Sequence, residues 1–229
     1  MRQLINKKKI YFYLLILLLL SSMFNFNILS KIENFSLIKD IDIVGLSSKE
    51  EIYVRNELKI FMNNNIFSIN KKNINKKLES FNFLDNYFIK KILPSKILVL
   101  AKKTEFIGIT IIEGNKFYMG LNGKLTLSSS VEKEENLPMI FGKFSIFEFL
   151  KLRNGLEKQQ FDLNQIKEYF YYQSKRWDLK KKDGTLIMLP SKNIQYSLNI
   201  YKNLINKNEF KSAQVIDLRI PKRIIVTND

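Results

Sequence analysis

The side chains that most often carry out chemistry in enzymes are missing from this chain. It contains neither histidine nor cysteine, so it lacks the commonest general base, the commonest metal ligand and any thiol nucleophile. Ser-His-Asp and Cys-His catalysis are therefore excluded. The carboxylates are scattered, and no pair of them stands out as an acid and a base. The sequence predicts no catalytic residue, no metal site and no cofactor, and we expect a protein that is not an enzyme.

A net charge of +16 indicates an acidic partner or surface, and nucleic acid is the first candidate. Only 6 of the 38 basic residues are arginine, the residue that best holds phosphate through two parallel hydrogen bonds. The lysines are spread along the chain. We therefore expect no nucleic-acid partner and no small-molecule substrate, while a weak attraction to anionic lipid or to an acidic partner stays open.

The N-terminal segment has the pattern of a membrane anchor. Residues 10–29 contain no charged side chain and directly follow three lysines, 7–9. About 20 apolar residues suffice to cross a bilayer as a helix. Because positive charge stays on the cytoplasmic side, we expect a cytoplasmic tail over 1–9, a transmembrane helix over 10–29 and a periplasmic remainder. The predicted anchor residues are Ile10, Leu14, Leu17 and Leu20.

A cleaved signal peptide is the competing interpretation of this segment, because it also has a basic start and a short apolar core. Residues 21–29 lack an Ala-x-Ala-like site of small residues. The sequence therefore favours an uncleaved single-pass anchor in the cytoplasmic (inner) membrane, and cleavage stays open as the alternative.

The residues after the anchor predict a small mixed domain. Ser48 and Glu51 have the spacing of a capping box, which marks the start of a helix. Pro94 cannot donate a backbone hydrogen bond, so we expect it at a turn between two strands. The expected elements, in β-α-α-β-β order, are a strand at 41–44, helices beginning at 48 and covering 71–81, and strands at 87–92 and 96–101.

From residue 105 the pattern predicts mostly strands. Asn122-Gly123 and Asp183-Gly184 each separate two apolar runs, which is the strongest short-range signal for a hairpin. Residues 165–172 are compatible with a strand or a helix. Other expected strands lie at 107–112, 117–121, 124–127, 176–179, 185–189, 215–220 and 223–226, with helices at 144–152 and 194–205. The fold class predicted is α+β, with a mainly antiparallel β domain and flanking helices.

Several short motifs are similar, in their order and spacing, to those of a known family. They are Ile41-Asp42-Ile43-Val44-Gly45, Ile89-Lys90-Lys91-Ile92-Leu93-Pro94, Leu137-Pro138-Met139-Ile140-Phe141-Gly142, Arg176-Trp177-Asp178-Leu179 followed by Asp183-Gly184, and Ile216-Asp217-Leu218-Arg219. The chain resembles the bacterial FtsQ family, called DivIB in Gram-positive bacteria, over nearly its whole length. The resemblance implies a POTRA-like domain over 37–104 and a C-terminal β domain over 105–229.

The resemblance also implies a function. Proteins of this family are non-enzymatic scaffolds of the cytoplasmic membrane that gather other divisome components at the septum, notably the coiled-coil membrane proteins FtsB and FtsL. The POTRA-like part is associated with recruitment to midcell, and the C-terminal part accepts a segment of an FtsB-like protein by strand addition. Two alternatives stay open: a POTRA-containing subunit for envelope assembly or secretion outside division, and a secreted enzyme with a cleaved leader.

Strand addition needs an exposed sheet edge, because the partner pairs with unused backbone N–H and C=O groups. The run 223–226 is the candidate edge, and Asp217 and Arg219 on the preceding strand could orient a charged partner. Trp177 is expected in the core. The predicted partner-binding residues are Asp217, Arg219, Ile220, Arg223, Ile224, Ile225 and Val226.

Overall fold

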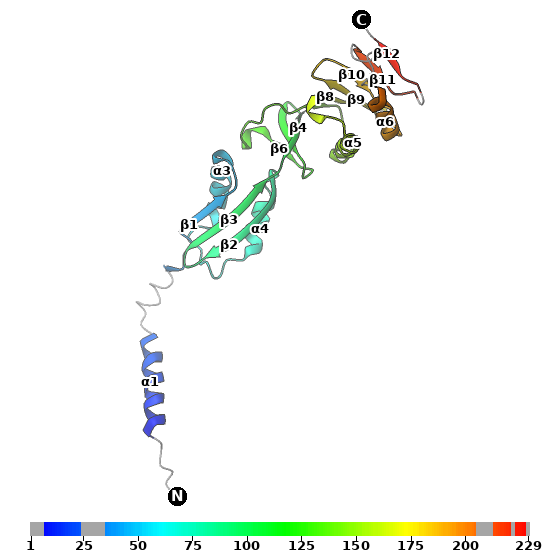
Figure 1. The fold of residues 1–229 in the computed structure, drawn as a ribbon. Helices are drawn as coiled ribbons and strands as arrows, with labels where there is room; N and C mark the ends of the chain where they lie inside the picture. Colours follow the sequence, from blue (N-terminus) through cyan, green and yellow to red (C-terminus); the bar gives the residue numbers. More distant parts are fainter. Residues whose placement is uncertain (1–6, 24–34, 205–212, 221–222, 228–229) are drawn as a thin grey trace. The chain divides into compact units, whose positions relative to one another are not determined.

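The computed structural model describes residues 7–23, 35–204, 213–220 and 223–227 (Figure 1). The chain divides into two compact units, and α1, the N-terminal helix Lys7–Met23, belongs to the first of them. The first contains the described residues up to 46 together with 51–80 and 87–101; the second contains 47–50, 81–86 and the described residues from 102 onward. The predicted α+β class, with a POTRA-like β-α-α-β-β unit and a large sheet, is confirmed.

The N-terminal helix covers only part of the predicted membrane segment. Among the described residues, no helix is both long and apolar enough to span a bilayer. Helix α1 begins with three lysines. The predicted segment 10–29 lies only partly within the described residues, because 24–29 fall outside them. The anchor residues Ile10, Leu14, Leu17 and Leu20 are all exposed along α1.

The first unit is built on a three-stranded sheet of order β1-β3-β2, in which β1 runs parallel to β3. Alternate residues of the strands and one stripe of each helix are apolar, so these side chains share a core that includes Ile43, Val54, Leu78 and Val99. The elements are β1 (Asp40–Val44), α3 (Ser48–Leu58), η1 (Lys59–Phe61), α4 (Lys71–Glu79), β2 (Leu84–Ile92) and β3 (Lys96–Lys103).

The start of α3 differs from the predicted capping box. The helix begins at Ser48 itself, so the capping position falls on Ser47, whose backbone N–H donates to Glu50 Oε2 at 3.1 Å. Glu51 instead accepts a hydrogen bond from Arg55 one turn later. Glu50 is fully buried and forms an ion pair with Lys103 Nζ at 2.7 Å. The pairing with Lys103, far away in sequence, selects Glu50 over Glu51 for the interior position.

The second unit contains a nine-stranded sheet of order β12-β11-β10-β9-β8-β7-β4-β5-β6. Antiparallel pairs predominate, but β4–β7, β7–β8 and β10–β11 are parallel, so the sheet is more mixed than predicted. The elements are β4 (Phe106–Ile112), β5 (Asn115–Gly120), β6 (Leu125–Leu127), β7 (Met139–Phe141), α5 (Ile146–Lys158), β8 (Ile166–Tyr171), β9 (Trp177–Lys181), β10 (Leu186–Met188), α6 (Ile194–Leu204), β11 (Val215–Asp217) and β12 (Ile225–Thr227).

Two helices account for two of the parallel pairs. A parallel strand can follow its neighbour only after a crossover that returns the chain to the same end of the sheet. Helix α5 connects β7 to β8, and α6 lies between β10 and β11. Both helices contribute to one buried cluster with the strands, through residues such as Phe149 and Leu156 on α5 and Leu198 and Tyr201 on α6. The segment 165–172, which the sequence left undecided, forms strand β8.

Trp177 lies at the centre of an aromatic cluster in this core. Its side chain is 3% exposed. Its ring centroid lies 4.7 Å from that of Tyr171, 5.5 Å from that of Phe144 and 5.8 Å from that of Phe149. These residues come from β8, from the segment before α5 and from α5 itself, so the indole ring joins the helix to the sheet.

We expect Trp177→Ala to lower the free energy of unfolding by about 3–5 kcal/mol, because it leaves a large cavity between α5 and the sheet. Urea unfolding followed by circular dichroism measures the change. Phe147→Ala, on the 75% exposed side chain of α5, is the matched control and should change stability by about 0.5 kcal/mol or less. An equally small effect at Trp177 would contradict its core role.

Candidate partner-binding edge

Strand β12 is the last strand of the large sheet. Within the described residues it pairs with β11 alone, antiparallel, with Ile225 opposite Asp217 and Thr227 opposite Val215. It covers Ile225–Thr227, so it is shorter and begins later than the predicted run 223–226. An edge strand has backbone groups on its outer side that a second strand can pair with.

The side chains around β12 alternate between the core and the surface. Ile224 and Val226 are half-buried and pack against the core cluster. Ile225 is 49% exposed on the opposite face, and Arg223 is exposed as well. Ile220 is 44% exposed and lies after the end of β11. An added strand would therefore meet Ile225 as its main apolar neighbour on the outer face.

Asp217 and Arg219 form a close ion pair at the end of β11. Arg219 Nε donates to Asp217 Oδ1 at 2.8 Å and Nη2 donates to Oδ2 at 2.6 Å, while the Arg219 backbone N–H also donates to Oδ1. Because these hydrogen bonds favour the ionised carboxylate, they lower the pKa of Asp217 and raise that of Arg219. Strand β11 ends at Asp217, so Arg219 lies just beyond the strand and not on it, where the sequence analysis had placed it.

The strand register places a second carboxylate in the same row. Asp178 on β9, Met188 on β10, Asp217 on β11 and Ile225 on β12 lie side by side across the sheet. Successive side chains of a strand alternate between faces, so this row lies on the face opposite to Trp177 and the helices. The carboxylates and the exposed apolar side chain of the edge strand therefore share one face of the sheet.

Asp178 is covered by arginine and tyrosine side chains. It is 1% exposed, and burial raises the pKa of its carboxyl group against the opposing effect of the Arg176 charge. Arg176 Nε lies 3.6 Å from Asp178 Oδ1, and the guanidinium lies 4.2 Å from the centre of the Tyr172 ring. The charge of Arg219 also acts on Asp178. Each of the two carboxylates on this face of the sheet therefore has an arginine close to it, Arg176 for Asp178 and Arg219 for Asp217.

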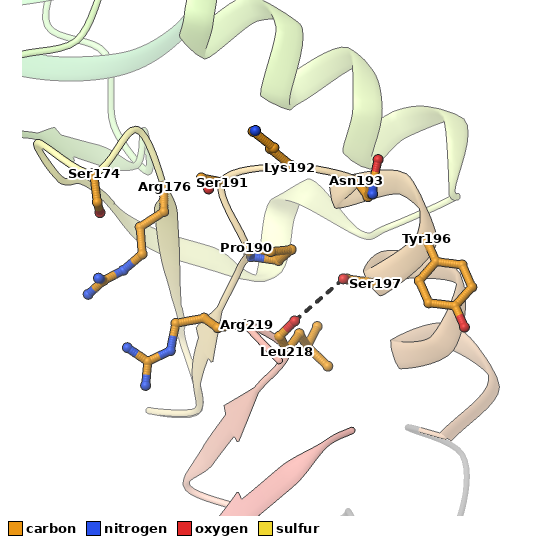
Figure 2. A pocket seen from close by; sticks show the side chains of 10 residues that line it. All are labelled: Ser174, Arg176, Pro190, Ser191, Lys192, Asn193, Tyr196, Ser197, Leu218 and Arg219. Atoms are coloured by element: carbon orange, nitrogen blue, oxygen red, sulfur yellow. Dashed lines mark hydrogen bonds between the residues drawn. The ribbon is translucent and has the colours of Figure 1, made fainter. Parts of the chain in front are cut away.

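A cavity of about 680 Å³ opens beside these arginines. Figure 2 shows the Arg176 and Arg219 side chains on one side of it and the segment leading into α6 on the other. Ser197 Oγ on α6 donates to the carbonyl oxygen of Leu218 at 3.5 Å, which ties the helix to the end of β11. The lining residues are Ser174, Arg176, Pro190, Ser191, Lys192, Asn193, Tyr196, Ser197, Leu218 and Arg219. The charged residues in this lining are all cations, so the cavity suits an acidic group.

Sequence reasoning found part of this site. It predicted Asp217, Arg219 and the last strand, but it assigned Arg176 and Asp178 only to a family motif and did not consider Lys192. The alternation along 176–179, with Trp177 in the core, was the one signal that Asp178 faces the other way. Within the described residues, no group of three or more acidic side chains is placed to hold a metal ion.

Comparisons with known proteins agree with this architecture. Residues 36–100 match the POTRA domain of FtsQ type, and residues 113–219 match the family described as cell division protein FtsQ/DivIB, C-terminal. The cell division protein FtsQ of Rickettsia bellii (strain RML369-C) is 25% identical over 184 residues, which are 80% of this chain and 68% of that protein. The FtsQ of Rhizobium meliloti (strain 1021) is 17% identical over 191 residues.

The matched region covers 82% of this chain but only 62% of the Rhizobium protein. Among solved structures, the chain is similar to the major extracytoplasmic domain of the trans isomer of the bacterial cell division protein DivIB from Geobacillus stearothermophilus. That likeness has 16% identity and a TM-score of 0.31, and it covers 45% of this chain and 92% of that domain.

The Asp217–Arg219 pair predicts a pH dependence of stability. The pKa of Asp217 in the folded protein is lowered from 3.8. The ionised carboxylate therefore adds to the free energy of unfolding in full above pH 3.8, and this stabilisation is lost as the pH falls through the lowered pKa of the folded protein. We expect the difference in unfolding free energy between the parent and Asp217→Asn to be largest above pH ~4 and to shrink at lower pH. Urea midpoints over this range measure it, and a difference that does not change with pH would contradict the ion pair.

Proposed function

The chain belongs to the FtsQ/DivIB family of cell division proteins, and on this premise we propose that it is a non-enzymatic scaffold of the divisome. In this role it recruits and links FtsB- and FtsL-like coiled-coil membrane proteins at the septum. The proposal rests on the position of β12, which is the edge strand of the large sheet and pairs only with β11 among the described strands. The proposed mechanism is the addition of a partner strand to β12.

The chemistry beside β12 supports this mode of binding. Backbone hydrogen bonds give such complexes affinity, and alternate side chains give them specificity. Ile225 offers an apolar contact on the outer face, and the cations Arg176, Lys192 and Arg219 line the neighbouring cavity. A partner segment that combines β-strand propensity with acidic side chains would fit this surface. Asp217 neutralises part of the Arg219 charge. This lowers the non-specific attraction of the surface for anions, so that binding depends more on the shape and charge pattern of the partner.

The location proposed for the scaffold is the cytoplasmic membrane, with residues 1–9 in the cytoplasm and both units outside. The sequence supports this part of the proposal through the charge-free segment 10–29 behind three lysines. In the proposed arrangement, 37–104 acts as the POTRA-like recruitment domain and 105–229 as the partner-binding domain. The alternative function is a POTRA-containing subunit of envelope assembly or secretion that has no part in division.

We expect Ile225→Pro to weaken binding of an FtsB-like segment by about tenfold or more, because proline cannot donate a backbone hydrogen bond and its ring disturbs the edge. The affinity is measured by isothermal titration or fluorescence anisotropy with a labelled partner segment. Circular dichroism would establish that the variant is folded.

Leu127→Pro is the matched control for this substitution. Leu127 is 41% exposed and belongs to β6, the three-residue strand at the other end of the same sheet. The proposal requires that Leu127→Pro leaves the affinity unchanged. Equal affinities for the parent and folded Ile225→Pro, or an equal loss in both variants, would refute strand addition at β12.

A further inference from the structure

Large apolar side chains are exposed at the end of the first unit where the chain enters it. Phe35, Ile60, Phe67 and Leu93 are exposed by 63%, 65%, 64% and 57%. We call this end the entry pole and define it as residues 35–39, 59–72 and 90–95. Contiguous exposed apolar groups mark surfaces that contact a protein or a membrane.

Backbone hydrogen bonds bring two of these side chains together. The N–H of Ile66 donates to the carbonyl oxygen of Ser36 at 2.9 Å, and this contact belongs to a short antiparallel pairing of the two segments. Phe35 directly precedes Ser36 and Phe67 directly follows Ile66, so both exposed phenylalanines flank this backbone contact. Two apolar side chains 32 positions apart in sequence thus belong to neighbouring segments of the surface.

The other two side chains belong to the same pole. The N–H of Lys39 donates to the carbonyl oxygen of Ser95 at 2.8 Å, which holds the β2–β3 turn, with Leu93 in it, against the segment 35–39. The side chain of Asn64 donates to the carbonyl oxygen of Ile60 at 3.3 Å, and its backbone oxygen accepts a bond from the incoming segment. The four apolar side chains therefore come from three segments that are fixed to one another.

The charges of the entry pole all have one sign. Its charged residues are Lys39, Lys59, Lys71, Lys72, Lys90 and Lys91. The carboxylates nearest along the chain already have lysine partners outside the pole: Asp40 and Asp42 pair with Lys96, and Glu57 pairs with Lys77. Exposed apolar groups combined with lysines and no acid are the pattern of a surface that binds anionic lipid.

We propose that the entry pole lies on the surface of an anionic membrane, with its apolar side chains among the lipid headgroups and its lysines near the phosphates. This inference rests on the proposed anchoring of the N-terminal segment. In that proposal the anchor ends at residue 29, so five residues, 30–34, separate it from Phe35, and even a fully extended segment of that length spans only about 20 Å. An anchored chain therefore keeps the pole within reach of the membrane, which favours lipid over an acidic protein as the surface it contacts.

The test uses the full chain with a tryptophan at the pole, reconstituted into vesicles of phosphatidylglycerol and phosphatidylcholine brominated on their acyl chains. Phe67→Trp reports on the entry pole. Phe147→Trp, at an exposed position of α5 in the second unit, is the matched control, and buried Trp177 gives the same background in both. We expect the brominated lipids to quench the emission of Phe67→Trp and not that of Phe147→Trp. Adding Lys71→Gln and Lys72→Gln should reduce the quenching.

Vesicle flotation in the same samples separates this inference from the proposed function. A chain that floats with the vesicles while Phe67→Trp stays unquenched is anchored, and the inference alone fails. Equal quenching of both tryptophans by the brominated lipids would also overturn the lipid contact of the pole. So would a Phe67→Trp side chain that is protected from an aqueous quencher but not quenched by lipid, because a protein would then cover the pole. A chain that does not float refutes both the anchoring and the lipid contact of the pole.

Discussion

The parallel pairing of β10 with β11 determines which strand ends the large sheet. The chain can make this pair only by crossing over through α6, and the crossover is held by Leu198 and Tyr201 in the core and by the bond from Ser197 to Leu218. Once β11 is placed, β12 can pair antiparallel on its outer side. The exposed edge, the Asp217–Arg219 pair and the basic cavity all depend on this one crossover, because each is built at the end of β11.

Local chemistry along the chain predicted the order of the elements. Asn122-Gly123 joins β5 to β6, and the aliphatic alternation of 41–44 forms β1. Contacts between distant residues decided what the local pattern could not. Lys103 selects Glu50 over Glu51 for the interior, and the crossovers through α5 and α6 make the β7–β8 and β10–β11 pairs parallel. Asp178 was missed as a site residue because only the register across β9, β10 and β11 places it in the same row as Asp217, with Met188 between them.

Charge is used in different ways on the two proposed contact surfaces. Near the sheet edge, two hydrogen bonds to Asp217 fix the position of the Arg219 side chain, and Arg176 lies 3.6 Å from buried Asp178, so the basic surface there is partly neutralised. At the entry pole the charged residues are all lysine, which gives attraction without a preferred direction. A protein strand requires defined geometry and a lipid surface does not. The lysine-rich composition alone does not indicate a binding surface. The entry pole is a basic surface because none of the residues that define it is acidic.

The position of a functional, fluorescently tagged copy in dividing cells tests the central claim, that this chain is a division scaffold, most directly. The account predicts a band at midcell that forms before constriction begins. An even distribution around the whole envelope, with no enrichment at the septum, would contradict it and favour a general envelope-assembly subunit.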